Sequence, residues 1–322
     1  MLFPVAAVRC SPTVETAARS AFLSFLLLVL VFLATVLFRI GTLPLTGADE
    51  PRYARIAEEM WRGGRWVTPL LEGSPWLEKP PLYYWITIPS YAVLGPSETT
   101  ARLGPALCLL AVSLMVLGLG RRVIHPVAGL YAGAIVLTSI GFVGFGRSAS
   151  TDMPFVACLT GALCLFGFDI VHTGTATWPL LAAYTFLGLA ILAKGPVTLV
   201  LAIGILSLFW WLDDHGGAIR KLRVIPGLLI AGFVAVPWFV LAFRENGFAF
   251  ISVFFINHHL MRYVTGIHHH SEPFYYYVPV LLGLLFPWSG WLPLLAHGID
   301  RGQLRPRKGW NRIGRASCRE RV

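Results

Sequence analysis

The chain has 322 residues, of which 56% are hydrophobic and only 13% are charged, and its formal net charge is +10. Soluble domains carry about a quarter charged residues, so this composition excludes an ordinary soluble protein. The basic excess does not indicate nucleic-acid binding, because residues 300–322 hold eight Arg or Lys against two acids and so supply +6 of the +10. The remaining excess is spread over short loops, as in membrane proteins, and no basic face interleaved with aromatic residues occurs.

Eight apolar segments close to the length that spans a bilayer, about 20 residues, predict an all-α, polytopic membrane protein. In chain order they lie at 21–40, 99–119, 126–146, 154–172, 177–193, 195–212, 224–243 and 274–297. The first is predicted to be an uncleaved anchor, because no small-residue cleavage site follows it. Together they define a membrane domain over 21–297, preceded by a cytoplasmic N-terminus, 1–20. A basic cytoplasmic tail, 298–322, follows it and is expected to be truncated or partly foreign.

A ninth apolar segment, 81–96, is broken by Pro89 and is marginal for spanning. If it stays at the outer surface, the basic loops 120–126 and 213–223 and the tail all lie on the cytoplasmic side, as the positive-inside rule requires. If it crossed, all of these would face outward. The segment is therefore predicted to be an interfacial helix, rich in Tyr and Trp, inside an outer loop at 41–98, with a second outer loop at 244–273.

This topology brings four polar stretches to one face of the membrane. They are 41–80, 147–153, the break at Lys194, and 244–273. Charged groups beside a bilayer are costly to place and are usually functional. Their convergence predicts a site at the outer surface.

The stretch "TGADEPRYARIAEEMWRGG" (46–64) predicts a helix lying flat on that surface. Pro51 suits its first turn, and Gly63 and Gly64 suit its end. Apolar residues recur at helical spacing opposite the charged ones, at Tyr53, Ile56, Ala57 and Met60. Asp49 or Glu50 could cap the helix, but a cap needs one carboxylate and there are two, which favours a catalytic or substrate role for Asp49.

In "WLEKPPLYYW" (76–85), Glu78 and Lys79 directly precede two prolines. Proline disfavours the helical conformation in the residue before it, so Lys79 is predicted to be extended, with the two side chains on opposite sides of the strand. A solvated loop pair is the alternative. The apolar surroundings favour a lysine that serves as counter-ion to a phosphate.

Asp152 in "RSASTDMPF" (147–155) precedes a membrane helix, and a cap and a site residue are equally compatible with its position. Lys194 in "LAKGPVTL" (192–199) lies between two apolar runs. It either extends to the membrane interface or binds phosphate, and the Gly-Pro break beside it favours phosphate.

Five of the nine histidines lie in 254–279. Imidazoles with nearby carboxylates are what a zinc site requires, but the spacing is not HExxH, so spacing alone favours a polar turn over a metal site. His258 and His259, followed by Arg262, are the better candidates.

Taken together, "GADEPRYARIAEEM", "WLEKPPLYYW", "ASTDMPF", "LAKGPV" and "FFINHHLMRYVTG" resemble the GT-C glycosyltransferases. The nearest subgroup contains the bacterial lipid A aminoarabinose transferases and the protein O-mannosyltransferases. The resemblance covers residues 20–297. One such motif is weak, whereas five in register along matching membrane segments are specific.

The resemblance implies a GT-C fold in a bacterial inner membrane, with an active site that faces the periplasm. The donor would be a polyprenyl-phosphate sugar, and the acceptor a lipid A-like glycolipid or a protein; no nucleotide cofactor is expected. Carried over motif by motif, the implied residues are the carboxylates Asp49, Glu50 and Asp152, the donor-phosphate ligands Arg52, Lys79, Lys194 and Arg262, and a metal-binding pair, Glu78 and His259, that would hold a divalent ion such as zinc.

This chemistry is consistent with the residue types. Cations in a water-poor site stabilise a departing phosphate, and a carboxylate base helps if the acceptor is a hydroxyl. If the acceptor is a phosphate, Asp49 would position it instead. A transporter or flippase for a lipid-linked or anionic substrate is the alternative, but it predicts midplane charges and internal repeats. A metal-dependent membrane hydrolase would need a tighter ligand spacing.

Overall fold

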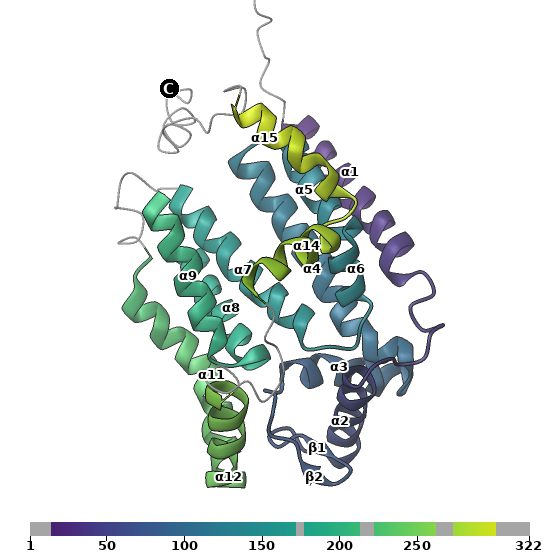
Figure 1. Ribbon diagram of the computed structural model, residues 1–322, viewed down its shortest axis with the longest axis vertical. Helices are drawn as coiled ribbons and strands as arrows, with labels where there is room; N and C mark the ends of the chain where they lie inside the picture. Colours follow the sequence, from purple (N-terminus) through teal and green to yellow (C-terminus); the bar gives the residue numbers. More distant parts are fainter. Residues whose placement is uncertain (1–13, 172–176, 213–221, 262–272, 301–322) are drawn as a thin grey trace, which may run out of the picture.

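The computed structural model describes residues 14–171, 177–212, 222–261 and 273–300. Most of the predicted stretch 1–20 and of the basic tail 298–322 lies outside these ranges. Within them the regular secondary structure is helical except for one short hairpin (Figure 1).

The first part of the chain runs from the N-terminal helix to the start of the central bundle. Its elements are α1 (Val14–Phe32), the π-helix η1 (Leu33–Leu37), α2 (Asp49–Gly63), β1 (Leu70–Leu71), β2 (Ser74–Pro75), α3 (Leu82–Leu94), α4 (Glu98–Val123), α5 (Pro126–Thr138), α6 (Ile140–Gly146) and α7 (Asp152–Val171). The second part contains α8 (Trp178–Lys194), α9 (Val197–Leu212), α11 (Val224–Asn246), α12 (Phe248–Phe250), the π-helix η2 (Ile251–Met261), η4 (Phe274–Tyr276), α14 (Tyr277–Leu284), η5 (Trp288–Trp291) and α15 (Leu292–Asp300).

All eight predicted apolar segments contain helices, which confirms an all-α membrane protein. Among the described residues, four helices are long and apolar enough to span: Arg19–Leu37, α4, Asp152–Asp169 in α7, and α11. Helices α8 and α9 are apolar but shorter. The segments 126–146 and 274–297, predicted as single spans, are each broken into two helices, with bends of 62° and 106°.

The bundle packs around α4 and α7. Leu28, Leu109, Leu137 and Met153, from α1, α4, α5 and α7, are buried in one cluster. Helix α4 packs against α5 at Gly120, where an added Cβ would lie 2.7 Å from the Cα of Gly129. Many large apolar side chains on the outside of the helices are exposed, as expected for a surface that faces lipid.

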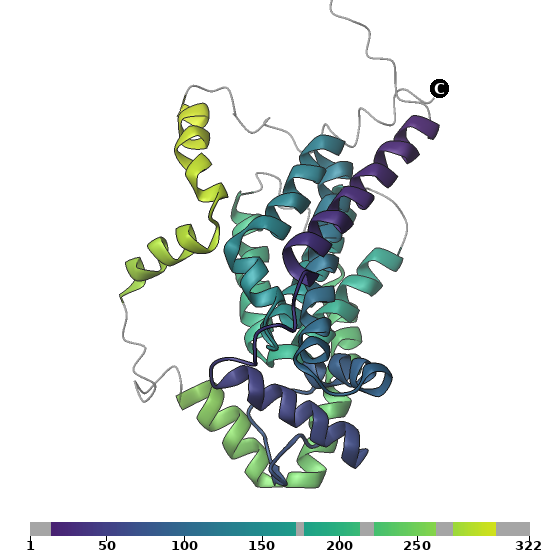
Figure 2. The ribbon, with the colours of Figure 1, turned by 90° about the vertical axis from the view of Figure 1, so that its right-hand side faces the viewer.

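At one end of the bundle, α2, α3, the hairpin and α12 gather (Figure 1), and α2 runs across this end instead of along the bundle (Figure 2). We call it the outer end, after the predicted topology. The apolar face of α2 is buried as its spacing predicts, against α3. Helix α3 has 13 residues, too few to cross a bilayer, so its prediction as a surface helix is confirmed. Its Tyr83, Tyr84 and Tyr91, however, face protein and not the membrane interface.

Candidate active site

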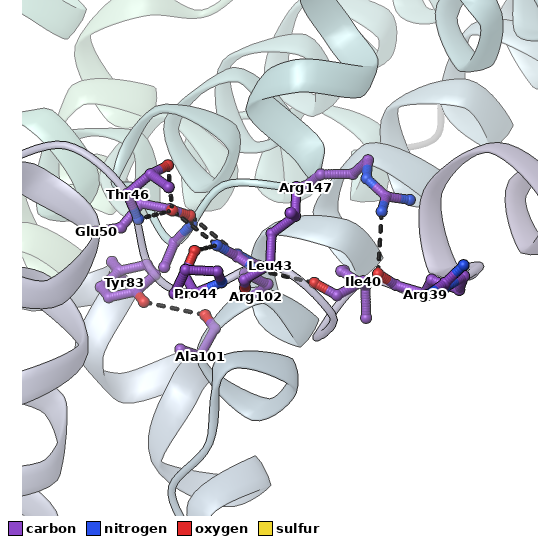
Figure 3. A network of polar contacts seen from close by, with 11 residues as sticks. Arg39, Ile40, Leu43, Pro44, Thr46, Glu50, Tyr83, Ala101, Arg102 and Arg147 are labelled. Atoms are coloured by element: carbon purple, nitrogen blue, oxygen red, sulfur yellow. Dashed lines mark hydrogen bonds and ion pairs between the residues drawn. The ribbon is translucent and has the colours of Figure 1, made fainter.

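The centre of the outer end is a buried ion pair between Glu50 of α2 and Arg102 of α4. Arg102 donates through Nε to Glu50 Oε1 over 3.0 Å and through Nη2 to Oε2 over 2.8 Å. The two side chains are only 8% and 5% exposed. The same carboxylate accepts a hydrogen bond from the backbone N–H of Thr46 at 2.8 Å (Figure 3). It also accepts one from the backbone N–H of Ala149 at 2.7 Å.

Arg102 uses its remaining donors on the connection between η1 and α2. It binds the carbonyl oxygens of Ile40, Leu43 and Pro44 at 2.9, 2.8 and 2.9 Å. Glu50 and Arg102 therefore form a clamp that joins this connection, α2, α4 and the 147–151 connector (Figure 3). Arg102 is not among the predicted site residues, although a lone arginine inside the apolar segment 99–119 indicates that it needs a partner.

The clamp bears on the predicted role of Glu50. Each of its carboxylate oxygens accepts hydrogen bonds from protein donors, and the group is buried. Ala48, not a carboxylate side chain, is the N-cap of α2. We infer that Glu50 positions its neighbour Asp49 relative to Asp152, because Glu50 is adjacent to Asp49 in α2 and binds the connector that leads into α7. Its predicted catalytic role has no support in this geometry.

The clamp should make stability depend on pH. Burial alone would raise the pKa of the Glu50 carboxyl, but hydrogen bonds from Arg102, Thr46 and Ala149 outweigh it and lower the pKa from 4.5 to about 2. A depressed pKa contributes stability above 4.5, and this contribution is lost as the pH falls towards about 2. The shift corresponds to about 3 kcal/mol.

We therefore expect the melting temperature in detergent to fall between pH 6 and pH 3, and to fall less steeply for Glu50→Gln, which has no carboxyl to titrate. If the melting temperatures of the parent and Glu50→Gln fell equally over this pH range, the low pKa assigned to the Glu50 carboxyl would be contradicted.

A second ion pair joins two residues that the sequence analysis selected separately. Asp152 begins α7, Lys194 ends α8, and the ammonium group pairs with the Asp152 carboxylate. The lysine Nζ also lies 5.3 Å from the ring centroid of Phe155, within range of a cation–π contact. Both charged side chains are about a third exposed, at 36% and 35%, so they are accessible to a ligand.

A third pair lies on α2 itself. Arg52 Nη1 is 3.2 Å from Asp49 Oδ1, and the Arg52 guanidinium stacks 5.0 Å from the ring centroid of Trp76. The indole Nε1 of Trp76 and the hydroxyl of Tyr84 are buried and have no hydrogen-bond partner among the described residues. Buried polar atoms are nearly always paired, so these two are exceptions in the packing beside Arg52.

Tyr53, which is predicted on the apolar face of α2, is buried there. Burial first, and then the negative charges of Asp49, Asp152 and Glu78, raise the pKa of the Tyr53 hydroxyl.

Glu78 and Lys79 lie between the hairpin and α3, and both are partly buried. The turn of the hairpin is held by Glu59 of α2, which accepts from the backbone N–H of Glu72 at 3.0 Å and of Gly73 at 3.2 Å. The chain bends at both Glu78 and Lys79 as it turns from β2 into α3, so the two residues are not part of a strand. The extended backbone of Lys79 itself stays a prediction.

The second outer loop is only partly described. Thr68 in the first loop bonds Glu245 and, at 2.7 Å, Asn246 at the end of α11, so the two loops meet. With the two clamped stretches, this confirms the predicted convergence of four polar segments. Arg262 and the side chain of His259 lie outside the described residues. The metal pair of Glu78 and His259 therefore stays a prediction; among the described side chains, no group of three or more metal ligands occurs.

The chain is similar in sequence to curated bacterial transferases. The chain is 32% identical over 295 residues to an undecaprenyl phosphate-alpha-4-amino-4-deoxy-L-arabinose arabinosyl transferase of Edwardsiella ictaluri, covering 88% of this chain and 50% of the relative. It is 28% identical to a second such transferase from Proteus mirabilis, covering 85% of this chain and 50% of the relative. The chain thus spans about half the length of the curated relatives it matches.

Its fold is also similar to a solved structure. The crystal structure of ArnT from Cupriavidus metallidurans bound to undecaprenyl phosphate superposes with a TM-score of 0.78 at 27% identity, covering 88% of this chain and 52% of that chain. The model of one protein family, described as dolichyl-phosphate-mannose-protein mannosyltransferase, matches residues 21–253, well over half of the chain. From the membrane bundle, the clustered charges and these matches together, the chain belongs to the dolichyl-phosphate-mannose-protein mannosyltransferase family.

Proposed function

We propose that the chain is a membrane glycosyltransferase that moves a sugar from a polyprenyl-phosphate donor to an envelope acceptor on the periplasmic face of a bacterial inner membrane. The observation that carries the proposal is that two carboxylate–cation pairs, Asp49 with Arg52 and Asp152 with Lys194, lie at the outer end with partly exposed side chains. The similar ArnT crystal structure holds undecaprenyl phosphate, a ligand of the proposed donor class.

The proposed reaction exchanges one bond for another at the anomeric carbon of the sugar. An acceptor oxygen forms a bond to that carbon, and the bond to the donor phosphate breaks, with its electron pair leaving on the phosphate. Arg52 and Lys194 stabilise the departing anion, because fixed cations are most effective where water is excluded. If the acceptor is a hydroxyl, its proton passes to Asp49; if it is already an anion, Asp49 only positions it.

The paired carboxylates also prevent Arg52 and Lys194 from binding other anions tightly before the donor arrives. Each cation is held by one carboxylate before the donor arrives, so its charge is oriented and partly offset. Exposed pairs of this kind contribute little to stability, roughly 0–1 kcal/mol. A donor phosphate can therefore displace the carboxylate at small cost.

The test is a pair of measurements on the protein in nanodiscs: binding of radiolabelled undecaprenyl phosphate, and transfer of sugar from a polyprenyl-phosphate donor to mixed envelope lipids and proteins. We expect Asp49→Asn to reduce transfer by about a hundredfold or more, because general-base or positioning groups contribute about 10²–10⁴. Its donor binding should change less than threefold.

Arg65→Ala, which removes an exposed arginine just after α2, is the matched control and should change neither. A parent protein that binds the donor and moves it across the bilayer without cleaving it would replace the proposal with a flippase. Equal transfer by the parent and Asp49→Asn would leave the activity but remove Asp49 from the site.

A further inference from the structure

Two cations of the candidate site, Arg52 and Lys194, each contact an aromatic ring as well as a carboxylate. The Lys194 Nζ lies 5.3 Å from the centroid of the Phe155 ring, and the Arg52 guanidinium lies 5.0 Å from the centroid of the Trp76 ring. Both distances are within the range of a cation–π contact. A charged partner and an uncharged aromatic partner therefore compete for each of these cations.

The rings are fixed by packing, whereas the carboxylates are more exposed. Phe155 is only 7% exposed and belongs to a buried cluster that includes residues of α7, α8 and α11. Trp76 packs against the buried cluster of α2 and α3, and its backbone N–H donates to the carbonyl of Pro69 over 2.8 Å. The carboxylate side chains of Asp49 and Asp152 are 65% and 36% exposed. When a ligand displaces a carboxylate, the ring is therefore the partner that stays in place.

Helix α7 carries both partners of Lys194 on one face. Asp152 and Phe155 stand at positions i and i+3 of this helix, and side chains with this spacing are neighbours on a helix surface. Lys194 reaches the same face from the end of α8. The ammonium group can therefore leave the carboxylate and keep its contact with the ring.

The attraction between a cation and a ring is stronger when water is absent than at an exposed site. In the free protein the side chains of Arg52 and Lys194 are about a third exposed, at 32% and 35%. A phosphate with an attached lipid chain excludes water from a cation that it binds, so each ring attracts its cation more strongly in the donor complex than in the free protein. Only such a difference between the two states can increase the affinity for the donor.

We propose that Phe155 and Trp76 are positioning residues, which hold Lys194 and Arg52 against the donor phosphate after the phosphate has displaced the carboxylates. The inference rests on the proposed function and deepens it, because it gives each of these two cations a second, uncharged partner. An aromatic ring suits this role, since it orients a cation without neutralising its charge. The full positive charge then stays available to the departing phosphate.

Removal of the ring is not a sufficient test, because Phe155→Leu leaves a cavity in the core and lowers stability whatever the ring does. Fluorinated phenylalanines in place of Phe155 avoid this problem. Each fluorine draws negative charge from the ring face and so weakens the cation–π contact, while the shape of the ring hardly changes. The matched control is the same series at Phe168, whose ring contacts Arg122 at 4.9 Å. Phe168 lies on the same helix, about 20 Å further along its axis, and is therefore remote from the site.

Undecaprenyl phosphate is the probe, and it is titrated against the protein in nanodiscs. We expect its affinity to fall with each fluorine added at Phe155, to about a third to a tenth of the parent's affinity with three fluorines, the range expected for loss of a partly desolvated cation–π contact. The same series at Phe168 should change the affinity less than about 1.5-fold, because its cation does not meet the donor. Fluorinated tryptophans in place of Trp76 should give the same trend through Arg52.

The outcomes separate the rings from the proposed function. A parent protein that binds the probe with an affinity independent of fluorine at Phe155 would keep the function and overturn the role of this ring, and the tryptophan series decides likewise for Trp76. An equal fall in affinity at Phe168 would reveal a general effect of fluorine on the fold and would overturn the proposal for both rings. A parent that binds no undecaprenyl phosphate would overturn the proposed function itself, and the roles of the rings with it.

Discussion

An Arg102→Ala variant should lose about 3 to 5 kcal/mol of folding free energy, the usual cost of removing one partner from a buried ion pair. The truncation leaves the Glu50 carboxylate buried with only part of its hydrogen bonds, and it also removes the donor for the carbonyls of Ile40, Leu43 and Pro44. The free energy of unfolding of a typical protein is only about 5 to 15 kcal/mol. The expected result is a sharp fall in melting temperature and in the monodisperse fraction after extraction in detergent.

Two further variants separate the clamp from a general effect of charge. Arg55→Ala removes an arginine of α2 whose pairs with Glu58 and Glu59 are more exposed, and it should cost less than about 1 kcal/mol. Arg102→Lys keeps the charge but not the planar fork, so it should lie between the parent and Arg102→Ala. If Arg102→Ala melted within a degree of Arg55→Ala, the clamp would not hold the outer end together.

A Lys194→Ala variant should transfer sugar about 10²- to 10³-fold more slowly than the parent, the range found when one group that stabilises developing charge is removed. The lysine lies at the end of α8, partly exposed, with its ammonium group held by Asp152 and close to the Phe155 ring. In the proposed site, its removal takes a cation from the departing phosphate and leaves Asp152 as an uncompensated repulsive charge. Initial rates at saturating and limiting donor would measure the loss.

The double variant distinguishes the two effects. The variant that combines Asp152→Asn with Lys194→Ala removes the repulsion but does not restore the cation. It should therefore recover only part of the transfer rate. Lys194→Arg should retain more activity than Lys194→Ala, because it restores the charge. A Lys194→Ala protein with the parent's rate would place the phosphate elsewhere.

Much of the local structure could be predicted from the sequence because it depends on local rules. The end of α2 is one case: Gly64 adopts the left-handed conformation with φ 62° and its N–H reaches the carbonyls of Met60 and Trp61. The burial of Tyr53, Ile56, Ala57 and Met60 follows from their 3.6-residue spacing. The surface position of 81–96 followed from charge balance across the membrane, a global rule that is nevertheless visible in one sequence.

The broken spans show what could not be predicted. The break after Thr138 contains no proline. At this break the backbone N–H of Ile140 donates to the carbonyl of Phe286 over 3.0 Å. Trp288 donates to Thr138 at the same place, over 2.8 Å. These partners lie about 150 residues away, so no local pattern announces the break. The second break, in contrast, contains Pro287, a signal that was present and not used.

The candidate site, too, could be predicted only in part. Residue types identified Asp152 and Lys194 as candidates, but only the fold brings the end of α8 to the start of α7. Asp49 and Glu50 look equivalent in sequence, and they differ because Arg102 binds one and not the other. Neighbouring carboxylates cannot be told apart until the partner of each is known.

The Glu50–Arg102 clamp also determines when the outer end can assemble during synthesis of the chain. Glu50 is made 52 residues before Arg102 and 99 residues before Ala149. The ribosome must therefore deliver α4, and then the connector that follows α6, before the carboxylate has all its partners. Until then the loop that carries Asp49 and Lys79 lacks the contacts that fix it to the bundle. The outer end is thus a structure that the later membrane segments assemble around the earlier loop, and the site cannot exist on a nascent chain that stops short of α7.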